Sequence, residues 1–205
     1  MFFGKWNKSV ILTYIGLAVS IFGIFICFNN YEKNVNLAMS CLIIAGVCDL
    51  FDGYIARKCK RTEQEKKFGI ELDSLVDTID FIALPIIIFL SLQMNTWYHF
   101  VIYTVFAVCG IARLAYFNIL VEDNSIPVKY YLGLPVTYTA LIFPVVYLFK
   151  YILPLNIFRI IYSILIIFVA VLNIINIKIK KPTGIAYFIF SLLAIAAITL
   201  YLGVL

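Results

Sequence analysis

Four aspartates stand within a short stretch of the sequence that apolar runs flank on both sides. Asp49 and Asp52 are three residues apart and Asp73 and Asp77 are four apart, so each pair shares one face of a helix. A short polar segment joins the pairs, which predicts two antiparallel helices whose four carboxylates converge. Carboxylates this close stay ionised only beside a cation. Hard oxygen ligands of this kind suit Mg²⁺, Mn²⁺ or Ca²⁺ rather than zinc.

Small residues accompany the aspartates. Gly53, Ala56 and Gly69 have almost no side chain, and they leave a surface on which a bulky group can lie against the backbone. Two divalent ions clamp the oxygens of a phosphoryl group, and Arg57 is placed to reach a phosphate or a paired acid. This combination predicts a binding site for a nucleotide diphosphate. The alternative is that the small residues serve close helix packing.

The chain around this stretch has the composition of a membrane protein. Of its 205 residues, 64% are hydrophobic and 13% charged, and the mean hydropathy is +1.03. Soluble domains average roughly 45–50% apolar and about 25% charged residues, and a spanning helix needs ~20 mostly apolar residues. Such runs lie at about 10–29, 36–56, 70–93, 97–118, 133–149, 155–177 and 184–204. We predict one all-α, polytopic transmembrane domain over residues 1–205, which begins with a short interfacial segment at residues 1–8.

The basic residues predict how this domain is oriented, because lysine and arginine concentrate in cytoplasmic connectors. They gather before the first run and after the second, fourth and sixth, at Lys5, Lys8, Arg57, Lys58, Lys60, Arg61, Lys66, Lys67, Lys129, Lys178, Lys180 and Lys181. This pattern predicts seven crossings, with the N-terminus inside, the C-terminus outside and the aspartates on the cytoplasmic side. The net charge of +5 then indicates anchoring on anionic lipid rather than binding of nucleic acid.

Several other kinds of catalytic centre are excluded. His99 is the single histidine, so no histidine triad or histidine-rich zinc site is expected. The five cysteines form no C-x-x-C pair, which argues against a disulfide framework or a zinc site. The sequence also lacks the glycine-rich patterns of P-loop and dinucleotide-binding proteins.

Together, the acidic and small residues form the pattern D-x-x-D-G-x-x-A-R, a spacer, and G-x-x-x-D-x-x-x-D. Its fixed positions are Asp49, Asp52, Gly53, Ala56, Arg57, Gly69, Asp73 and Asp77. This highly specific pattern resembles the signature of the CDP-alcohol phosphatidyltransferases, which join a headgroup alcohol to a phosphatidyl group carried by CDP. The spacer of eleven residues, 58–68, is longer than is usual in that family. We expect its extra charged residues to lengthen the cytoplasmic loop.

The resemblance implies a fold, a cofactor and roles for these residues. The fold is a six-helix core, here with a seventh helix at the C-terminus, in a homodimer in the cytoplasmic membrane of a prokaryote. Two divalent cations, Mg²⁺ or Mn²⁺, are held on the pyrophosphate by Asp49, Asp52, Asp73 and Asp77. The CDP-lipid is bound by Asp49, Asp52, Gly53, Ala56, Arg57, Gly69 and Asp73. Asp77 is the expected general base, because a carboxylate must take the acceptor's hydroxyl proton.

The acceptor is predicted from a closer likeness. The segments ELDSLVD, GIARLAYFN and GLPVTYTA resemble those of phosphatidylserine synthases, and the likeness extends over about residues 36–145. It implies transfer from CDP-diacylglycerol to L-serine. Arg113 is the basic residue within an apolar run that could bind the serine carboxylate. Asn118 could assist it, and Asp80 could meet the ammonium group.

Other interpretations stay open from the sequence. The same chemistry could use glycerol 3-phosphate or an inositol phosphate, although such acceptors favour several convergent basic groups. Arg113 could instead form a structural ion pair with Asp80 or Asp77. A membrane prenyltransferase needs no D-G-x-x-A-R block, and a cation transporter would place its acids near the midplane of the bilayer. Diacylglycerol and archaeal ether lipids are not distinguished.

Overall fold

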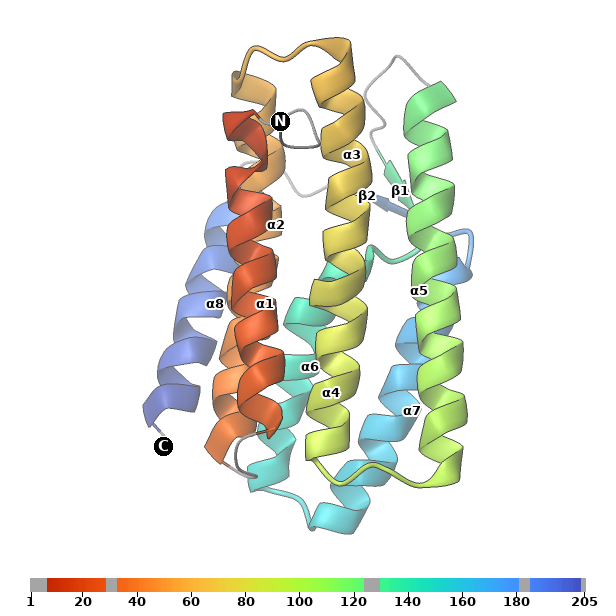
Figure 1. Ribbon diagram of the computed structural model, residues 1–205. Coiled ribbons are helices and arrows are strands. Elements are labelled where there is room, and N and C mark those ends of the chain that lie inside the picture. The colour runs from red at the N-terminus through yellow and green to blue at the C-terminus, as the bar shows by residue number, and fades with distance from the viewer. Residues whose placement is uncertain (1–6, 29–32, 124–129, 181–184, 204–205) are drawn as a thin grey trace.

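The computed structural model describes residues 7–28, 33–123, 130–180 and 185–203. Figure 1 shows a bundle in which consecutive long helices run in opposite directions. Its elements are η1 (Lys8–Val10), α1 (Ile11–Phe28), α2 (Lys33–Lys58), α3 (Glu63–Thr78), the π-turn η2 (Ile79–Ala83), α4 (Leu84–Ser91), α5 (Trp97–Asp123), β1 (Tyr130–Leu132), η3 (Val136–Tyr138), α6 (Thr139–Tyr147), η4 (Leu148–Tyr151), α7 (Leu155–Ile174), β2 (Lys178–Lys180) and α8 (Ile185–Gly203).

The described helices confirm the predicted all-α, polytopic membrane protein. Those long and apolar enough to cross a membrane are Lys8–Phe28, Asn34–Lys58, Glu63–Ser91, Trp97–Leu120 and Leu155–Ile174. The predicted runs 133–149 and 184–204 correspond to shorter apolar helices, Val136–Tyr151 and Phe190–Gly203. In Figure 1, α1 begins at the end of the bundle where α2 meets α3, and α8 ends toward the opposite side. Residues 1–6, predicted to be interfacial, lie outside the described residues.

Close packing of α1 on α2 follows from a stripe of small side chains on α1. The buried members of this stripe are Thr13, Gly16, Ser20, Gly23 and Cys27. A Cβ added at Gly23 would lie 3.0 Å from the Cβ of Cys41 on α2, which is tighter than nine in ten real Cβ contacts. Small residues spaced three and four apart allow such contact between membrane helices. The stripe therefore holds α1 against the helix that carries Asp49 and Asp52.

α3 begins earlier than the sequence predicted. Only residues 59–62 connect α2 to α3, and α3 starts at Glu63. The Thr62 hydroxyl accepts a hydrogen bond from the Glu65 N–H at 3.3 Å, and the Thr62 N–H donates to the Glu65 carboxylate at 2.7 Å. This reciprocal capping box stabilises a helix start. The prediction of a longer loop was therefore wrong, because the extra charged residues add turns to α3 instead.

α3 and α4 form one continuous helix interrupted by the π-turn. Pro85 lacks the N–H that would bond the Phe81 carbonyl four residues earlier. That carbonyl instead accepts a hydrogen bond from the Thr139 hydroxyl of α6 at 3.3 Å. In a membrane, every freed backbone group needs such a partner. The π-turn holds Asp80, one turn beyond Asp77, and such turns often occur at functional sites.

An aromatic core fills the end of the bundle away from the α2–α3 connection. It consists of Phe89, Phe143, Tyr147, Phe158, Tyr162 and Tyr201, all fully buried. The Phe89 ring packs edge to face on Phe143 and Tyr162, with centroids 4.9 and 5.3 Å apart. The Tyr162 hydroxyl donates to the Phe143 carbonyl at 2.8 Å. The buried Tyr162 hydroxyl thus has a hydrogen-bond partner within the bundle.

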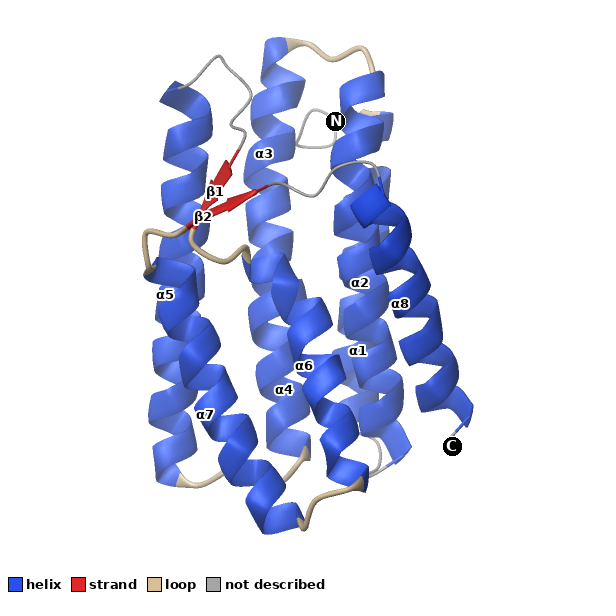
Figure 2. Ribbon diagram, turned by 180° about the vertical axis from the view of Figure 1, so that it is seen from behind, coloured by secondary structure: helices blue, strands red, loops and turns tan. Residues whose placement is uncertain are grey.

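A small two-stranded sheet joins two connectors near the other end. β1 precedes α6 and β2 precedes α8, and the two strands pair antiparallel, with Tyr131 opposite Ile179. Gly133 follows β1 with a φ of +72°, and a Cβ there would lie 2.5 Å from the Asn173 carbonyl oxygen. Glycine is therefore required for the turn. Figure 2 shows the two strands in front of α5 and beside α3.

Candidate active site

Three of the four signature aspartates come together in the structure. Asp49 and Asp52 project from the last turns of α2, and Asp73 projects from the facing part of α3. Each offers a carboxylate oxygen, and these oxygens all lie within 4.8 Å of one another. Oxygen ligands at this spacing fit a divalent cation such as Mg²⁺ or Mn²⁺. We call Asp49, Asp52, Asp73, Asp77 and Asp80 the acidic cluster.

Asp77 and Asp80 lie directly beside these three acids. All five line one cavity of about 10 Å³, together with Thr13, Gly16, Cys48 and Val76. Asp77 and Asp80 are 7% and 2% exposed. A cavity this small is at the lower limit for one water molecule. The carboxylates are therefore packed against one another and against α1.

The acidic cluster lacks basic partners within the described residues, where the ion pair found is Lys66–Glu63. The cluster does receive a hydrogen bond from α1, which the Thr13 hydroxyl donates to the Asp52 carboxylate at 3.0 Å. One oxygen of Asp80 is buried without a hydrogen-bond partner in this part of the chain. Burying several like charges without a counter-charge is costly. The set of donors therefore fits a divalent metal centre, which would supply the missing positive charge.

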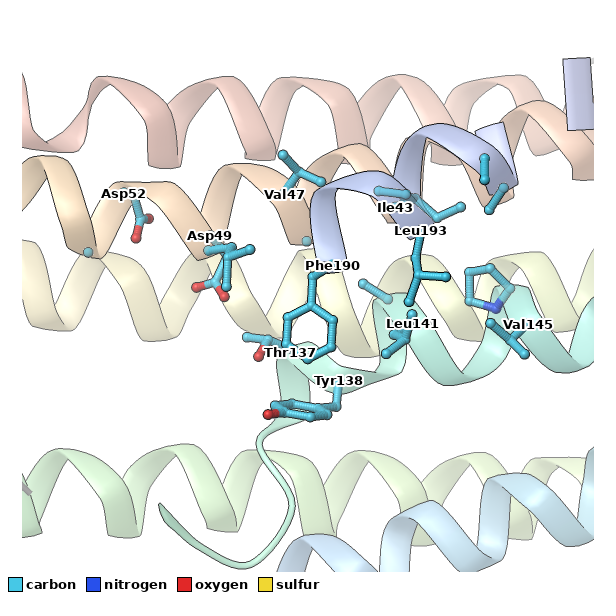
Figure 3. Close-up of a pocket in the computed structure, with 18 of the residues that line it drawn as sticks. Ile43, Val47, Asp49, Asp52, Thr137, Tyr138, Leu141, Val145, Phe190 and Leu193 are labelled. Carbon is cyan, nitrogen blue, oxygen red and sulfur yellow. The ribbon is translucent and has the colours of Figure 1, made fainter. Parts of the chain in front are cut away.

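A larger cavity of about 420 Å³ opens from the acidic cluster and runs between α2, α6 and α8. Figure 3 shows Asp52 and Asp49 at one end of it and Leu141, Leu193 and Val145 toward the other. Its polar end is also lined by Gly53, Arg57, Asp73 and Tyr131. The rest of its lining is mostly apolar, including Ile43, Val47, Leu148 and Leu200. The cavity is thus lined by acidic side chains at one end and by apolar side chains along the rest of its length.

The glycines separate packing from ligand binding. A Cβ at Gly46 would lie 2.5 Å from the Cβ of Ala140, so Gly46 is required where α2 crosses α6. At Gly53 the nearest atom to an added Cβ is 3.7 Å away, and at Gly69 it is 3.8 Å away, both on arginine side chains. Packing therefore leaves room for a side chain at Gly53 and Gly69. Their smallness favours an open surface for a ligand over close helix packing.

The remaining residues of the predicted nucleotide site lie nearby. Arg57 lines the larger cavity and is exposed, so its guanidinium is available to an anion. Ala56, one residue earlier, is half-buried and is not among the residues that line this cavity. Gly69 lies on α3, one turn before Asp73. The structure thus brings Gly53 and Arg57 to the cavity with the aspartates, whereas Ala56 and Gly69 do not line it.

Arg113 and Asn118 lie on α5, on one side of α3. Arg113 is buried, with its guanidinium carbon 5.1 Å from the Phe117 ring centroid and 5.8 Å from that of Tyr131. Asp77 and Asp49 are the acids whose charges act on it, yet it forms no ion pair with the described residues. The alternative of a structural ion pair is therefore not seen. Asn118 accepts a hydrogen bond from the Ser74 hydroxyl of α3 at 2.9 Å.

Asp80 faces the opposite side of α3. A Cβ at Gly16 of α1 would lie 3.2 Å from a carboxylate oxygen of Asp80. Figures 1 and 2 agree that α1 and α5 lie on opposite sides of α3. The structure therefore places Asp80 against α1 and does not bring it together with Arg113, on which the charge of Asp77 acts.

Sequence reasoning missed two contributors to the site. Thr13 looks like an ordinary polar residue in an apolar run, but it belongs to the small stripe of α1, and that spacing could have shown that it faces α2. Tyr131 lines the cavity and stacks on Arg113 because the pairing of β1 with β2 holds it there. Two strands of three residues leave no clear periodic signal in the sequence.

Comparisons with known proteins agree with this geometry. The chain is 38% identical over 103 residues to the CDP-diacylglycerol–serine O-phosphatidyltransferase of Saccharomyces cerevisiae, over 47% of this chain and 36% of that protein. It is 33% identical over 156 residues to the protein of the same name in Methanocaldococcus jannaschii, over 75% of this chain and 69% of that protein. It is 31% identical to the archaetidylserine synthase of Methanothermobacter thermautotrophicus, over 54% of this chain and 46% of that protein.

These matches vary in extent. The aligned part is little more than a third of the yeast protein and of a Mycobacterium tuberculosis relative, where it is 37%. No solved structure matches the chain significantly. The family model described as CDP-alcohol phosphatidyltransferase, in contrast, matches residues 6–204, which is nearly the whole chain. With Asp49, Asp52 and Asp73 gathered at one end of a largely apolar cavity, the chain therefore belongs to the CDP-alcohol phosphatidyltransferase family.

Proposed function

We propose that the protein transfers the phosphatidyl group of CDP-diacylglycerol to L-serine, forming phosphatidylserine and CMP. The observation that carries this proposal is the larger cavity, which has Asp49, Asp52 and Asp73 at one end and apolar side chains along its length. A ligand that fits it has a phosphate-rich head and a hydrocarbon tail, as a CDP-lipid does. The names of the yeast and archaeal relatives support serine as the acceptor.

The head of the cavity would hold the pyrophosphate. Asp49, Asp52 and Asp73, with Asp77 beside them, would bind two divalent cations, Mg²⁺ or Mn²⁺. When bound, these cations would neutralise charge on the transferred phosphoryl group and on the departing CMP. The open surface at Gly53 and the exposed Arg57 would receive the cytidine and its phosphate.

Asp77 would act as the general base. Its carboxylate takes the proton of the serine hydroxyl while that oxygen attacks the phosphorus next to the lipid glycerol. The new bond joins the serine oxygen to this phosphorus, and the bond from the phosphorus to the CMP oxygen breaks. Asp77 suits this role because it is nearly fully buried beside the other acids and its charge also acts on Arg113. A base must be within reach of the proton that it removes.

Arg113 would bind the serine carboxylate. Its guanidinium is stacked on Phe117 and Tyr131 and makes no ion pair with the described residues, so its charge remains for an incoming anion. Asn118, held by Ser74, would complete this side of the acceptor site. Asp80 would attract the ammonium group. It lies against α1, whereas Arg113 and Asn118 lie on α5, so its interaction with serine would be less direct than theirs. A single arginine suits a zwitterionic acceptor better than a phosphorylated one.

The orientation and assembly are part of the proposal. Arg57, Lys58, Lys60, Arg61, Lys66 and Lys67 lie at the α2–α3 end of the bundle, which supports a cytoplasmic location for the acidic cluster in the membrane of a prokaryote. The family resemblance also suggests a homodimer. Labelling of cysteines introduced at Lys60 and Gly203 in sealed vesicles tests the orientation, and the mass of the detergent-solubilised protein tests the dimer.

An acceptor screen tests the activity. The purified protein is incubated with CDP-diacylglycerol and Mg²⁺ or Mn²⁺, and CMP release is measured with serine, glycerol 3-phosphate, inositol phosphate or ethanolamine. We expect release with serine, loss of it in EDTA, and recovery when the divalent ion is restored. Parallel reactions with a CDP-activated archaeal ether lipid show which lipid backbone is accepted. Full activity in EDTA, or release with another acceptor alone, would contradict the proposal.

A further inference from the structure

α8 is tied to α6 near both of its ends by aromatic side chains. Near its start, the rings of Phe190 and Tyr138 pack edge to face with centroids 6.2 Å apart. Near its end, the buried Tyr201 hydroxyl donates a hydrogen bond to the Pro144 carbonyl. The Tyr201 ring also lies 5.8 Å from that of Tyr147. These contacts fix both ends of α8 relative to α6, while α8 packs along α2 between them.

Between the two aromatic contacts, α8 presents three alanines and two leucines to the cavity. Its residues that line this stretch are Leu193, Ala194, Ala196, Ala197 and Leu200. Figure 3 shows Phe190 and Leu193 facing Tyr138 and Leu141 across the space that begins at Asp49. The space exists because alanines leave α8 and α6 apart where larger side chains would fill the gap. We call it the slot.

The length of the slot matches one leaflet of a membrane. Phe190 and Leu200 are ten residues apart, which is ~15 Å along a helix. The hydrocarbon core of a bilayer is ~30 Å thick, so one leaflet contributes about half of that. The slot starts beside the acidic cluster and runs away from the α2–α3 end. A hydrocarbon chain attached to a headgroup at Asp49 would therefore lie in it along its own leaflet.

We propose that α8 is the wall that selects the hydrocarbon chain of the CDP-lipid. Ala194 and Ala197 provide the width for one chain, the Phe190–Tyr138 contact marks where that chain enters, and the Tyr201–Pro144 contact marks where it ends. This inference rests on the proposed function, because the occupant is the tail of the proposed donor substrate. It assigns substrate selection to the C-terminal helix, which carries none of the signature residues.

The test compares long-chain and short-chain donors. Ala197→Phe should lower the catalytic efficiency for a long-chain CDP-lipid by at least about tenfold, since each methylene excluded from an apolar site costs roughly fourfold in binding. A CDP-lipid whose chains are too short to pass Phe190 should change by less than about twofold. Ile195→Phe is the matched control, because Ile195 is 61% exposed and does not line the cavity. It should leave both donors unaffected.

The outcomes separate this inference from the proposed function. Equal loss with both donors, or no loss with either, overturns the role of α8. If the unaltered protein releases CMP from neither donor, the proposed function itself fails. If Ala197→Phe does not accumulate in the membrane, the inference is tested with Leu193→Ala, which widens the slot. It should raise the efficiency for methyl-branched chains relative to straight chains by at least about threefold, and an unchanged ratio overturns the inference.

Discussion

The acidic cluster and the aromatic core are two buried regions of one bundle, and they treat their polar groups in opposite ways. In the aromatic core, hydroxyls have partners: Tyr147 and Tyr151 both donate to the Asn36 side-chain oxygen at 2.9 Å. In the acidic cluster, five carboxylates are gathered without a basic partner among the described residues, and an oxygen of Asp80 is unpaired. Native structures satisfy nearly all buried polar groups. The difference supports the proposal that bound cations complete the acidic cluster, whereas the aromatic core satisfies its hydroxyls internally.

The glycines repeat this contrast. Gly46 lies where α2 and α6 touch, and it is needed for that contact. Gly53, two turns further along α2, has room beside it. The same residue type therefore serves packing in one place and leaves open space in the other, where we propose that the CDP-lipid binds. Only the distances to neighbouring atoms tell the two roles apart.

The largest effect is expected from Asp49→Asn. It removes one negative charge from the proposed metal centre, so CMP release should fall below detection. The same change relieves repulsion between buried carboxylates, so the metal-free protein should unfold at a higher temperature. Thermal unfolding in EDTA and CMP release with Mg²⁺ measure the two effects. Glu71→Gln, an exposed acid on α3, is the control; equal effects at both positions would remove the contrast.

Asp77→Asn should give the next largest loss. It keeps the shape of the side chain but removes the proposed proton acceptor, so turnover should fall by roughly 10²–10⁴. Binding of CDP-lipid should survive better than in Asp49→Asn. Single-turnover kinetics and a CDP-lipid binding assay separate these quantities. Near-normal turnover would show that another group takes the proton.

Arg113→Ala should act on serine rather than on the lipid. A charge-assisted contact with a carboxylate contributes about 1.5–3 kcal/mol, so the KM for serine should rise roughly 10–100-fold. The KM for CDP-lipid should change little, and Arg113→Lys should recover part of the loss. Steady-state kinetics with serine varied at saturating CDP-lipid provide the measurement. An unchanged serine KM would place the acceptor site elsewhere.

Gly53→Leu tests the open surface beside the acids. Packing has room there and leucine is favourable in a membrane helix, so the protein should fold, while the KM for CDP-lipid rises about tenfold. Gly46→Ala should instead lower the free energy of unfolding by about 1–3 kcal/mol, because its Cβ would overlap Ala140. Thermal unfolding and steady-state kinetics of both variants give the comparison. Destabilisation by Gly53→Leu with normal binding would assign Gly53 to packing.

The two regions also differ in how far the sequence predicts them. The acids could be predicted to converge because Asp49 and Asp52 share a helix face and so do Asp73 and Asp77, and helix periodicity is a local property. The start of α3 was mispredicted although the capping signal at Thr62 and Glu65 was present, because charge was taken as the mark of a loop.

Other features depend on contacts between distant segments. The spacing of Asp80 from Asp77 suggested a shared site with Arg113, but the packing of α1 and α5 on opposite sides of α3 decides which neighbour each acid meets. The slot between α6 and α8 requires both helices to be in place, since its aromatic contacts join residues about fifty positions apart. Local pattern therefore predicts the proposed catalytic groups better than the surroundings that determine their specificity.

The smallest effect on activity is expected from Tyr147→Phe. The change removes a hydroxyl that donates to Asn36 in the aromatic core, and a buried hydrogen bond of this kind contributes about 0.5–1.5 kcal/mol. Asn36 keeps the hydroxyl of Tyr151 as a donor, so the loss should stay within this range and lower the unfolding temperature by a few degrees. Because the acidic cluster lies at the other end of the bundle, turnover should remain within about twofold. Tyr116→Phe, at a position that is 54% exposed, should alter neither quantity. A fall in turnover as large as that of Arg113→Ala would mean that the aromatic core sets the geometry of the acids, and the division between the two regions would have to be abandoned.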